Sequence, residues 1–110
     1  MVNYSAQLDL TFSAISDPTR RAILSQLAQG EASIMELASP YAMSLPAISK
    51  HIRVLEIAGL LTRTKRGRVN YCHLNAGPLR EAGKWLAFYQ RFWDTKLDAL
   101  EDFLEENGEK

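Results

Sequence analysis

The sequence predicts a mainly α-helical domain that contains one small β-hairpin and ends in a long amphipathic helix. Three observations predict this fold class. Before residue 60, residues that typically cap helices, and proline, precede segments in which apolar residues recur every three or four positions. Between residues 60 and 74, strand-favouring residues flank a basic turn, and apolar residues at helical spacing resume from residue 78. The chain of 110 residues can bury one modest core, so residues 1–106 are expected to form a single domain.

The first 30 residues are expected to form two helices. The first covers residues 4–15. Asp17 is the expected cap of the second helix, and Pro18 occupies its first position. Proline has no amide hydrogen, but an N–H group at this position would have no partner within the helix, so no hydrogen bond is lost. This second helix is expected to run to Gln29 and to end at Gly30.

A short helix and a longer amphipathic helix follow, with a turn between them. Ser33 and Glu36 have the spacing of a capping box, so the short helix is expected to begin at Ile34. Ser44 is the expected cap of the next helix. The apolar residues that repeat at three and four positions, and so form its buried stripe, are Ile48, Ile52 and Leu55. This arrangement predicts a helix-turn-helix at about residues 33–58.

The segment at about residues 60–74 is expected to form a hairpin, which we call the wing. β-Branched and aromatic residues favour strands on either side of residues 65–68, a basic segment with glycine that supplies the turn. A two-stranded hairpin is not stable alone. Leu61 and Leu74 are therefore expected to anchor the wing on the helical core.

A long helix is expected at about residues 78–106, with Asn75 near its cap and a loose tail at residues 107–110. About 29 residues at about 1.5 Å each give a helix more than about 40 Å long, which extends beyond the rest of so small a domain. Its surplus apolar face needs a partner, and a second copy of the chain is the simplest one, giving a two-fold dimer. The expected dimer residues are Leu8, Phe12, Trp85, Tyr89, Phe92, Trp93, Leu97, Leu100 and Leu104.

Positive charge is concentrated in residues 44–74, although the formal net charge of the chain is zero. This stretch contains six basic residues against one acidic residue, a local balance of +5. Residues 1–43 contain two basic and four acidic residues, and residues 75–110 contain five and eight. Since a helix fits the major groove and a basic hairpin reaches the flanking phosphates, the charge pattern indicates a DNA-binding regulator.

Two stretches, DPTRRAILSQLAQGEASIMELA and MSLPAISKHIRVLEIAGLLTRTKRGRVNYCHL, resemble the winged-helix repressors of the ArsR family. The resemblance covers nearly the whole chain. The tail PLREAGKWLAFYQRFWDTKLDALEDFL is similar to a subgroup without metal sites, often encoded beside START-like ligand-binding proteins. The resemblance implies a winged helix-turn-helix of order α-α-α-α-β-β-α. It also implies a cytoplasmic homodimer that represses transcription by binding an imperfect palindrome in double-stranded DNA.

The resemblance also implies which residues contact DNA. Those expected to face the major groove are Ser44, Pro46, Ala47, Ser49, Lys50 and Arg53. Those expected on flanking phosphates are Lys65, Arg66 and Arg68, for which a solvated charged turn is the alternative. Many relatives have glutamine and serine where this chain has Leu45 and Pro46, which removes two groups that hydrogen-bond to bases. Pro46 and Ala47 suit thymine methyl groups, Ser49 suits a base edge, and Lys50 and Arg53 suit bases or phosphates.

Several other residues have two interpretations each. His51 lies between the apolar stripe and the basic face, where it either makes a structural hydrogen bond or contacts a phosphate. Arg20 and Arg21 are expected to be charges on the surface or at the rim of the dimer, with a phosphate contact as the alternative. Cys72 is expected to be a small buried packing residue, with a redox or alkylation switch as the alternative. The aromatic residues of the long helix are expected to pack, although they are also able to line a ligand pocket at the dimer interface.

The sequence argues against other functional classes. The two histidines and one cysteine match no metal-ligand spacing and no nucleophile–base pair, so we expect no metal, no cofactor and no enzyme. No apolar run approaches the roughly 18–20 residues of a membrane span, and the N-terminus lacks signal-peptide features. A winged-helix module that binds protein and not DNA is the alternative function. The sequence names no effector ligand.

Overall fold

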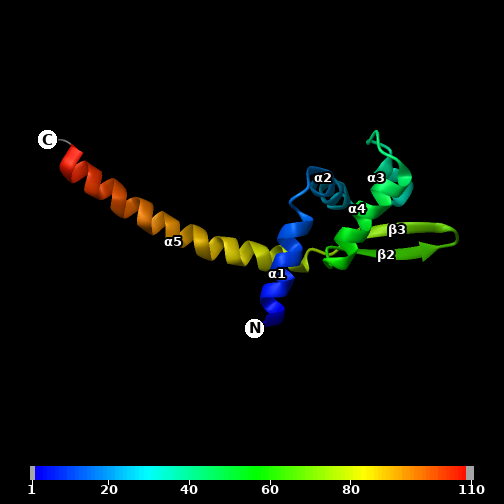
Figure 1. The fold of residues 1–110 in the computed structure, drawn as a ribbon, viewed down its shortest axis with the longest axis horizontal. Coiled ribbons are helices and arrows are strands. Elements are labelled where there is room, and N and C mark those ends of the chain that lie inside the picture. The colour runs from blue at the N-terminus through cyan, green and yellow to red at the C-terminus, as the bar shows by residue number, and fades with distance from the viewer. Residues whose placement is uncertain (1, 109–110) are drawn as a thin grey trace.

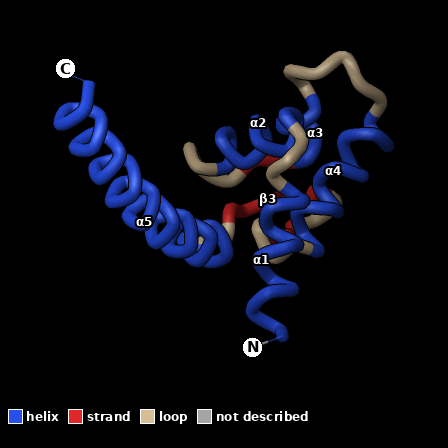
Figure 2. The backbone as a smooth tube through the Cα atoms, turned by 60° about the vertical axis from the view of Figure 1, so that its left-hand side comes forward, coloured by secondary structure: helices blue, strands red, loops and turns tan. Residues whose placement is uncertain are grey.

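The computed structural model describes residues 2–108 and confirms the predicted fold class, a mainly helical winged helix-turn-helix with a long C-terminal helix (Figure 1). The elements, in chain order, are α1 (Val2–Ala14), α2 (Pro18–Leu27), β1 (Ala32–Ser33), α3 (Ile34–Ala38), α4 (Leu45–Ile57), β2 (Leu61–Arg66), β3 (Val69–Leu74) and α5 (Gly77–Gly108). Figure 2 shows the helices α1–α4 gathered around the small sheet, with α5 leading away from them.

The predicted helix caps are present, and they fix where three helices begin. The carboxylate of Asp17 accepts a hydrogen bond from the backbone N–H of Arg20 at 3.0 Å, and this bond holds the pKa of Asp17 below its ordinary value. Ser33 and Glu36 form the reciprocal capping box. Helix α2 ends two residues earlier than predicted, at Leu27, because the chain turns before it reaches the glycine at position 30.

The sheet contains three antiparallel strands in the order β1-β3-β2, one more than the sequence predicted. In the wing, β2 pairs with β3 from Leu61 opposite Leu74 to Arg66 opposite Val69. The additional strand β1 consists of two residues and pairs with the middle of β3, where Ser33 lies opposite Tyr71. The wing is therefore tied to the segment that leads into the helix-turn-helix.

The turn of the wing is tighter than predicted. It consists of Gly67 and Arg68 alone, because Lys65 and Arg66, which were expected in the turn, are the last residues of β2. Gly67 has a φ of +63° at the first central position of this two-residue connection. Glycine with positive φ at that position is typical of a type II′ turn, whose twist matches that of the flanking strands.

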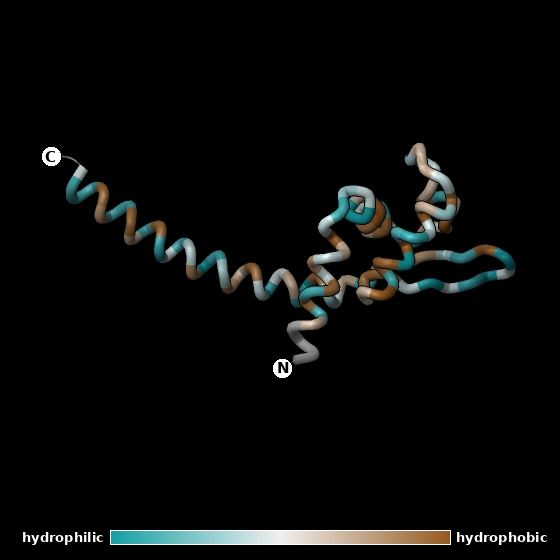
Figure 3. The backbone as a smooth tube through the Cα atoms, in the orientation of Figure 1, coloured by the Kyte–Doolittle hydropathy of each residue, from teal (hydrophilic) through white to brown (hydrophobic). Residues whose placement is uncertain are grey.

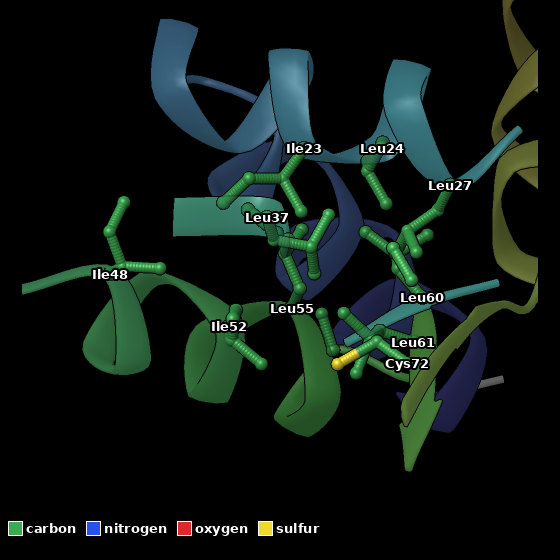
Figure 4. Packing of buried hydrophobic residues seen from close by; sticks show 13 residues of the cluster. Ile23, Leu24, Leu27, Leu37, Ile48, Ile52, Leu55, Leu60, Leu61 and Cys72 are labelled. Carbon is green, nitrogen blue, oxygen red and sulfur yellow. The ribbon is translucent and has the colours of Figure 1, made fainter. Parts of the chain in front are cut away.

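The core lies between α2, α3, α4 and the base of the wing (Figure 4). Its largest fully buried side chains are Ile23, Leu37, Ile48, Ile52, Leu55, Leu60, Leu61, Thr11 and Cys72. The three residues predicted for the buried stripe of α4 are among them. Leu61 is fully buried and Leu74 packs against the core, which confirms the predicted anchor of the wing.

Helix α5 extends far beyond this core. Its first turns pack against α1 and bury Ala82, whereas all its side chains from Phe88 to Gly108 are exposed. The Cα radius of gyration is 19.6 Å, compared with about 13 Å for a compact domain of this length. Hydrophobic residues recur along the rod (Figure 3). The helix reaches Gly108, so residues 107 and 108 are helical where a loose tail was expected, while residues 109–110 lie outside the described part of the chain.

Candidate nucleic-acid interface

The N-terminal end of α4 is positioned by its cap. The hydroxyl oxygen of Ser44 accepts a hydrogen bond from the backbone N–H of Ala47 at 3.2 Å, and Pro46 stands in the first turn. The remaining free N–H groups of this turn give the helix a partial positive charge at this end. Such an end attracts phosphate oxygens, so the start of α4 suits an approach to a DNA backbone.

The positions of the buried residues of α4 determine which of its other residues face the solvent. Because the buried stripe is completely inaccessible, the residues about half a turn away point into solvent. Pro46, Lys50 and Arg53 are exposed, while Ala47 and Ser49 are half-buried on the flank of the same face. The structure thus brings the residues predicted for the major groove onto one surface, with two cations at its centre.

His51 takes part in a network that links three helices. Its Nδ1 atom lies 3.2 Å from Nη1 of Arg20 and 3.9 Å from Oδ2 of Asp17. Arg20 also donates from Nε to the backbone oxygen of Ala14 at 2.7 Å and from Nη2 to that of Ser13 at 3.2 Å. Arg20, which the sequence predicted at the surface or at the dimer rim, is partly buried and holds the end of α1 against α4.

The three basic residues predicted for the wing differ in their surroundings. Lys65 and Arg68 are exposed near the tip. Arg66 instead forms an ion pair with Glu31, and its guanidinium carbon lies 3.9 Å from the ring centroid of Tyr71. Arg63, at the base of the wing, pairs with Glu56 at 3.2 Å. Among residues 2–108, four of the six cations in the basic stretch therefore lack an ion pair, and these are Lys50, Arg53, Lys65 and Arg68.

An apolar groove lies between α3, the start of α4 and the wing. It has a volume of about 270 Å³ and is lined by Ser33, Ile34, Met35, Leu45, Ser49, Arg68, Val69 and Asn70. Met35, Leu45 and Val69 are large hydrophobic residues that are 67%, 45% and 42% exposed. The predicted site did not include Met35, Val69 or Asn70, because they come from elements that only the fold brings together.

The described residues give no support for a metal or redox site. Residues 2–108 contain no group of three or more histidine, cysteine, aspartate or glutamate side chains arranged to hold a metal ion. Cys72 is fully buried, and burial raises the pKa of its thiol, which disfavours the reactive thiolate. These properties favour the packing role for Cys72. Within residues 2–108, no helix combines the length and the apolar character that a membrane crossing requires.

The predicted dimer residues form a continuous, largely exposed apolar surface on α1 and α5. The rings of Phe12 and Trp85 meet edge to face, with 5.7 Å between their centroids. The ring centroids of Trp85 and Tyr89 are 4.6 Å apart. Farther along, Phe92, Trp93, Leu97, Leu100 and Leu104 are each about half exposed. The hollows beside the aromatic residues have volumes of about 200–250 Å³ and are open to solvent, so they offer a ligand little enclosure.

Comparison with known proteins places this geometry in a family. Residues 17–63 match the family described as bacterial regulatory protein, arsR family. Over 86 residues the chain is 36% identical to the transcriptional repressor SdpR of Bacillus subtilis (strain 168), an alignment that covers 78% of this chain and 96% of that protein.

Solved structures agree with the sequence comparison. The fold is similar to a crystal structure of an ArsR family transcriptional regulator, with 42% identity and a TM-score of 0.77 over 82% of this chain and 93% of the other. It is also similar to the homodimeric winged helix-turn-helix DNA-binding domain of a possible ArsR-family regulator from Mycobacterium bovis. In that case the identity is 26% and the TM-score 0.58, over 89% of this chain and 85% of the other.

Proposed function

The chain belongs to the arsR family of bacterial regulatory proteins, which are DNA-binding transcriptional regulators and not enzymes, and we propose that it acts as a homodimeric repressor. In this proposal α4 enters the major groove of each half of an imperfect palindrome, and Lys65 and Arg68 of the wing lie against flanking phosphates. The repressor function follows the similarity to SdpR.

The observation that supports the DNA contact most directly is the exposed face of α4. Lys50 and Arg53 project from it beyond reach of any acidic partner among the described residues, next to the capped helix start. Unpaired cations on one surface repel each other in the free protein. DNA phosphates relieve that repulsion, and the release of counterions from the DNA adds to the gain.

The charges of α5 support an antiparallel pairing of two copies. Residues 77–93 contain three basic residues and one acidic residue, whereas residues 94–108 contain six acidic residues and one basic residue. A two-fold axis near the middle of α5 would place the acidic half of each helix alongside the basic half of its partner. These charges lie on the side away from the apolar stripe, so they favour this orientation at long range and not through contacts across the interface. The same pairing would cover the apolar stripe that each copy leaves exposed.

The proposal is tested by titrating fluorescent duplexes from upstream of the protein's own gene, with a scrambled duplex as control, across a series of salt concentrations. Binding of one dimer that exceeds binding to the scrambled duplex by about a thousandfold or more is the expected result. Equal binding to both duplexes with a steep salt dependence would contradict sequence-specific repression through this DNA. Absence of binding at low salt would favour a protein-binding winged helix instead.

A further inference from the structure

We propose that Arg66 is a positioning residue that clamps the tip of the wing to β1 through Tyr71 and Glu31, and not a phosphate contact. This inference rests on the proposed function for its consequence in DNA binding, but the clamp itself is a property of the free protein. It changes the earlier assignment, in which Arg66 contacts DNA together with Lys65 and Arg68.

The clamp crosses all three strands of the sheet. Arg66 is the last residue of β2, Tyr71 lies on the central strand β3, and Glu31 immediately precedes β1. The guanidinium carbon of Arg66 lies 3.9 Å from the centroid of the Tyr71 ring, and Nη2 of Arg66 donates to Oε2 of Glu31. The second oxygen of the same carboxylate lies 3.6 Å from Nδ1 of His73. Glu31 therefore joins a residue from each strand of the wing.

The strand register explains why these side chains meet. Thr64 and Ser33 both lie opposite Tyr71, on either side of the central strand. Since side chains alternate between the two faces of a sheet, Arg66, Tyr71 and Glu31 share one face. Cys72 points to the other face, where it is buried in the core. The clamp thus lies on the outer face of the wing, away from the packing that anchors its base.

The tip of the wing needs such a contact because the core does not reach it. The buried residues of the wing are Leu61 at its base and Cys72 at the middle of β3, and β1 pairs only with residues 71 and 72 of β3. In the part of the chain that the structure describes, no third strand lies beside residues 65–70. A planar guanidinium that stacks on an aromatic ring and bonds to a carboxylate is well suited to hold a two-stranded ribbon in one orientation.

The same geometry makes Arg66 a poor ligand for phosphate. Its charge is balanced by Glu31, and a phosphate close to Arg66 would also approach that carboxylate. Lys65 and Arg68 have no acidic partner among the residues that the structure describes. The wing therefore presents two free cations per protomer to DNA, and the third fixes their position.

The first experiment compares Arg66→Ala with Arg66→Lys, because lysine keeps the charge but loses the planar fork. Hydrogen exchange of the free protein is followed at the amides of residues 65–70. Both variants are expected to exchange about two- to fivefold faster there, the range for one exposed ion pair and its stacking. Glu31→Gln is expected to have the same effect. Adding it to Arg66→Ala should change nothing further at residues 65–70, because the remaining contact of Glu31, with His73, lies nearer the base of the wing. Lys65→Ala is the control, with exchange close to the parent protein; equal exchange in all variants would overturn the clamp.

The second experiment measures how the DNA affinity of each variant depends on salt. Lys65→Ala is expected to reduce the slope of log K against log salt by about 0.9 per protomer, whereas both Arg66 variants keep the parent slope with a weaker affinity. A reduced slope in Arg66→Ala that Arg66→Lys restores would show a phosphate contact and overturn the proposal. If no duplex binds, the proposed function fails, while hydrogen exchange still decides whether the clamp exists.

Discussion

At the scale of single residues, the start of α4 has apolar side chains at positions where a helix that reads bases commonly has side chains that form hydrogen bonds. Leu45 and Pro46 are exposed, and Leu45 lines the groove together with Met35 and Val69. Exposed leucine costs hydration free energy in the unbound protein, and contact with an apolar group on DNA recovers it. The thymine methyl is the apolar group that the major groove offers.

We therefore expect thymine methyl groups in the operator to contribute to affinity through Leu45. Replacing one thymine of the half-site by deoxyuridine removes a single methyl, and at the contacted position binding should weaken about fourfold, the equivalent of about 0.8 kcal/mol. Titration of a set of such duplexes measures the effect. The variant Leu45→Ala should bind thymine and deoxyuridine duplexes alike. If parent and variant lose the same affinity on the substituted duplexes, Leu45 does not read the methyl.

At the scale of elements, the network around Arg20 joins α1, which bears predicted dimer residues, to α4, the proposed recognition helix. Arg20 donates to two backbone oxygens at the end of α1 and lies against His51 of α4. Gln7 makes a second link, since its Nε2 atom donates to the backbone oxygen of Ala58 at the C-terminal end of α4 at 3.0 Å. The position of α4 is therefore tied to α1 at its middle, through His51, and at its C-terminal end.

Replacing Arg20 by alanine should loosen this connection. The variant leaves the backbone oxygen of Ala14 without this donor, whereas Ser16 still donates to the backbone oxygen of Ser13. We expect the variant to lower the free energy of unfolding by about 1–2 kcal/mol, as measured in urea. Arg21→Ala is the matched control, because Arg21 is exposed and makes one such bond, to the backbone oxygen of Ile15. A loss in Arg21→Ala as large as that in Arg20→Ala would contradict the special role of Arg20.

The elements also show what the sequence could predict and why. Helix starts were predicted well because a cap is a local interaction, and Ser44 bonds to an amide only three residues away. The exposed face of α4 was predictable because its buried stripe defines it. Strand β1 was missed because two residues have no periodicity, and their pairing partners lie about 40 residues away. The pairing of Arg66 was missed for the same reason, since Glu31 is 35 residues distant.

At the scale of the whole molecule, a helix of 32 residues belongs to a domain whose longest dimension is 71 Å. Only the beginning of this helix packs against the core. Along the rest of the helix, apolar residues recur at helical spacing, which indicates a surface that packs against another helix. In the proposed antiparallel dimer, Phe92 and Trp93 lie at the middle of α5 and so closest to the two-fold axis.

A charge at that centre should separate the protomers. Trp93→Glu would bring two carboxylates together across the axis, and we expect monomers in sedimentation at concentrations where the parent protein is dimeric. Affinity for the full palindrome should fall by about 10²–10⁴, because each half-site then binds independently. Thr95→Glu adds the same charge outside the apolar stripe and should leave the dimer intact. A dimeric Trp93→Glu variant would show that the two-fold axis does not lie at this point.

Binding of DNA by the exposed face of α4 is best tested by removing the two cations on that face, Lys50 and Arg53. The measurement is an anisotropy titration of Lys50→Ala/Arg53→Ala against the operator duplex, beside a control, Arg80→Ala/Arg91→Ala, which removes the same charge from the side of α5 opposite its apolar stripe. We predict that the α4 variant keeps its helix content and its dimer but loses operator binding, while the control binds like the parent protein. Normal binding by the α4 variant, or equal losses in both variants, would contradict the assignment of α4 as the recognition helix.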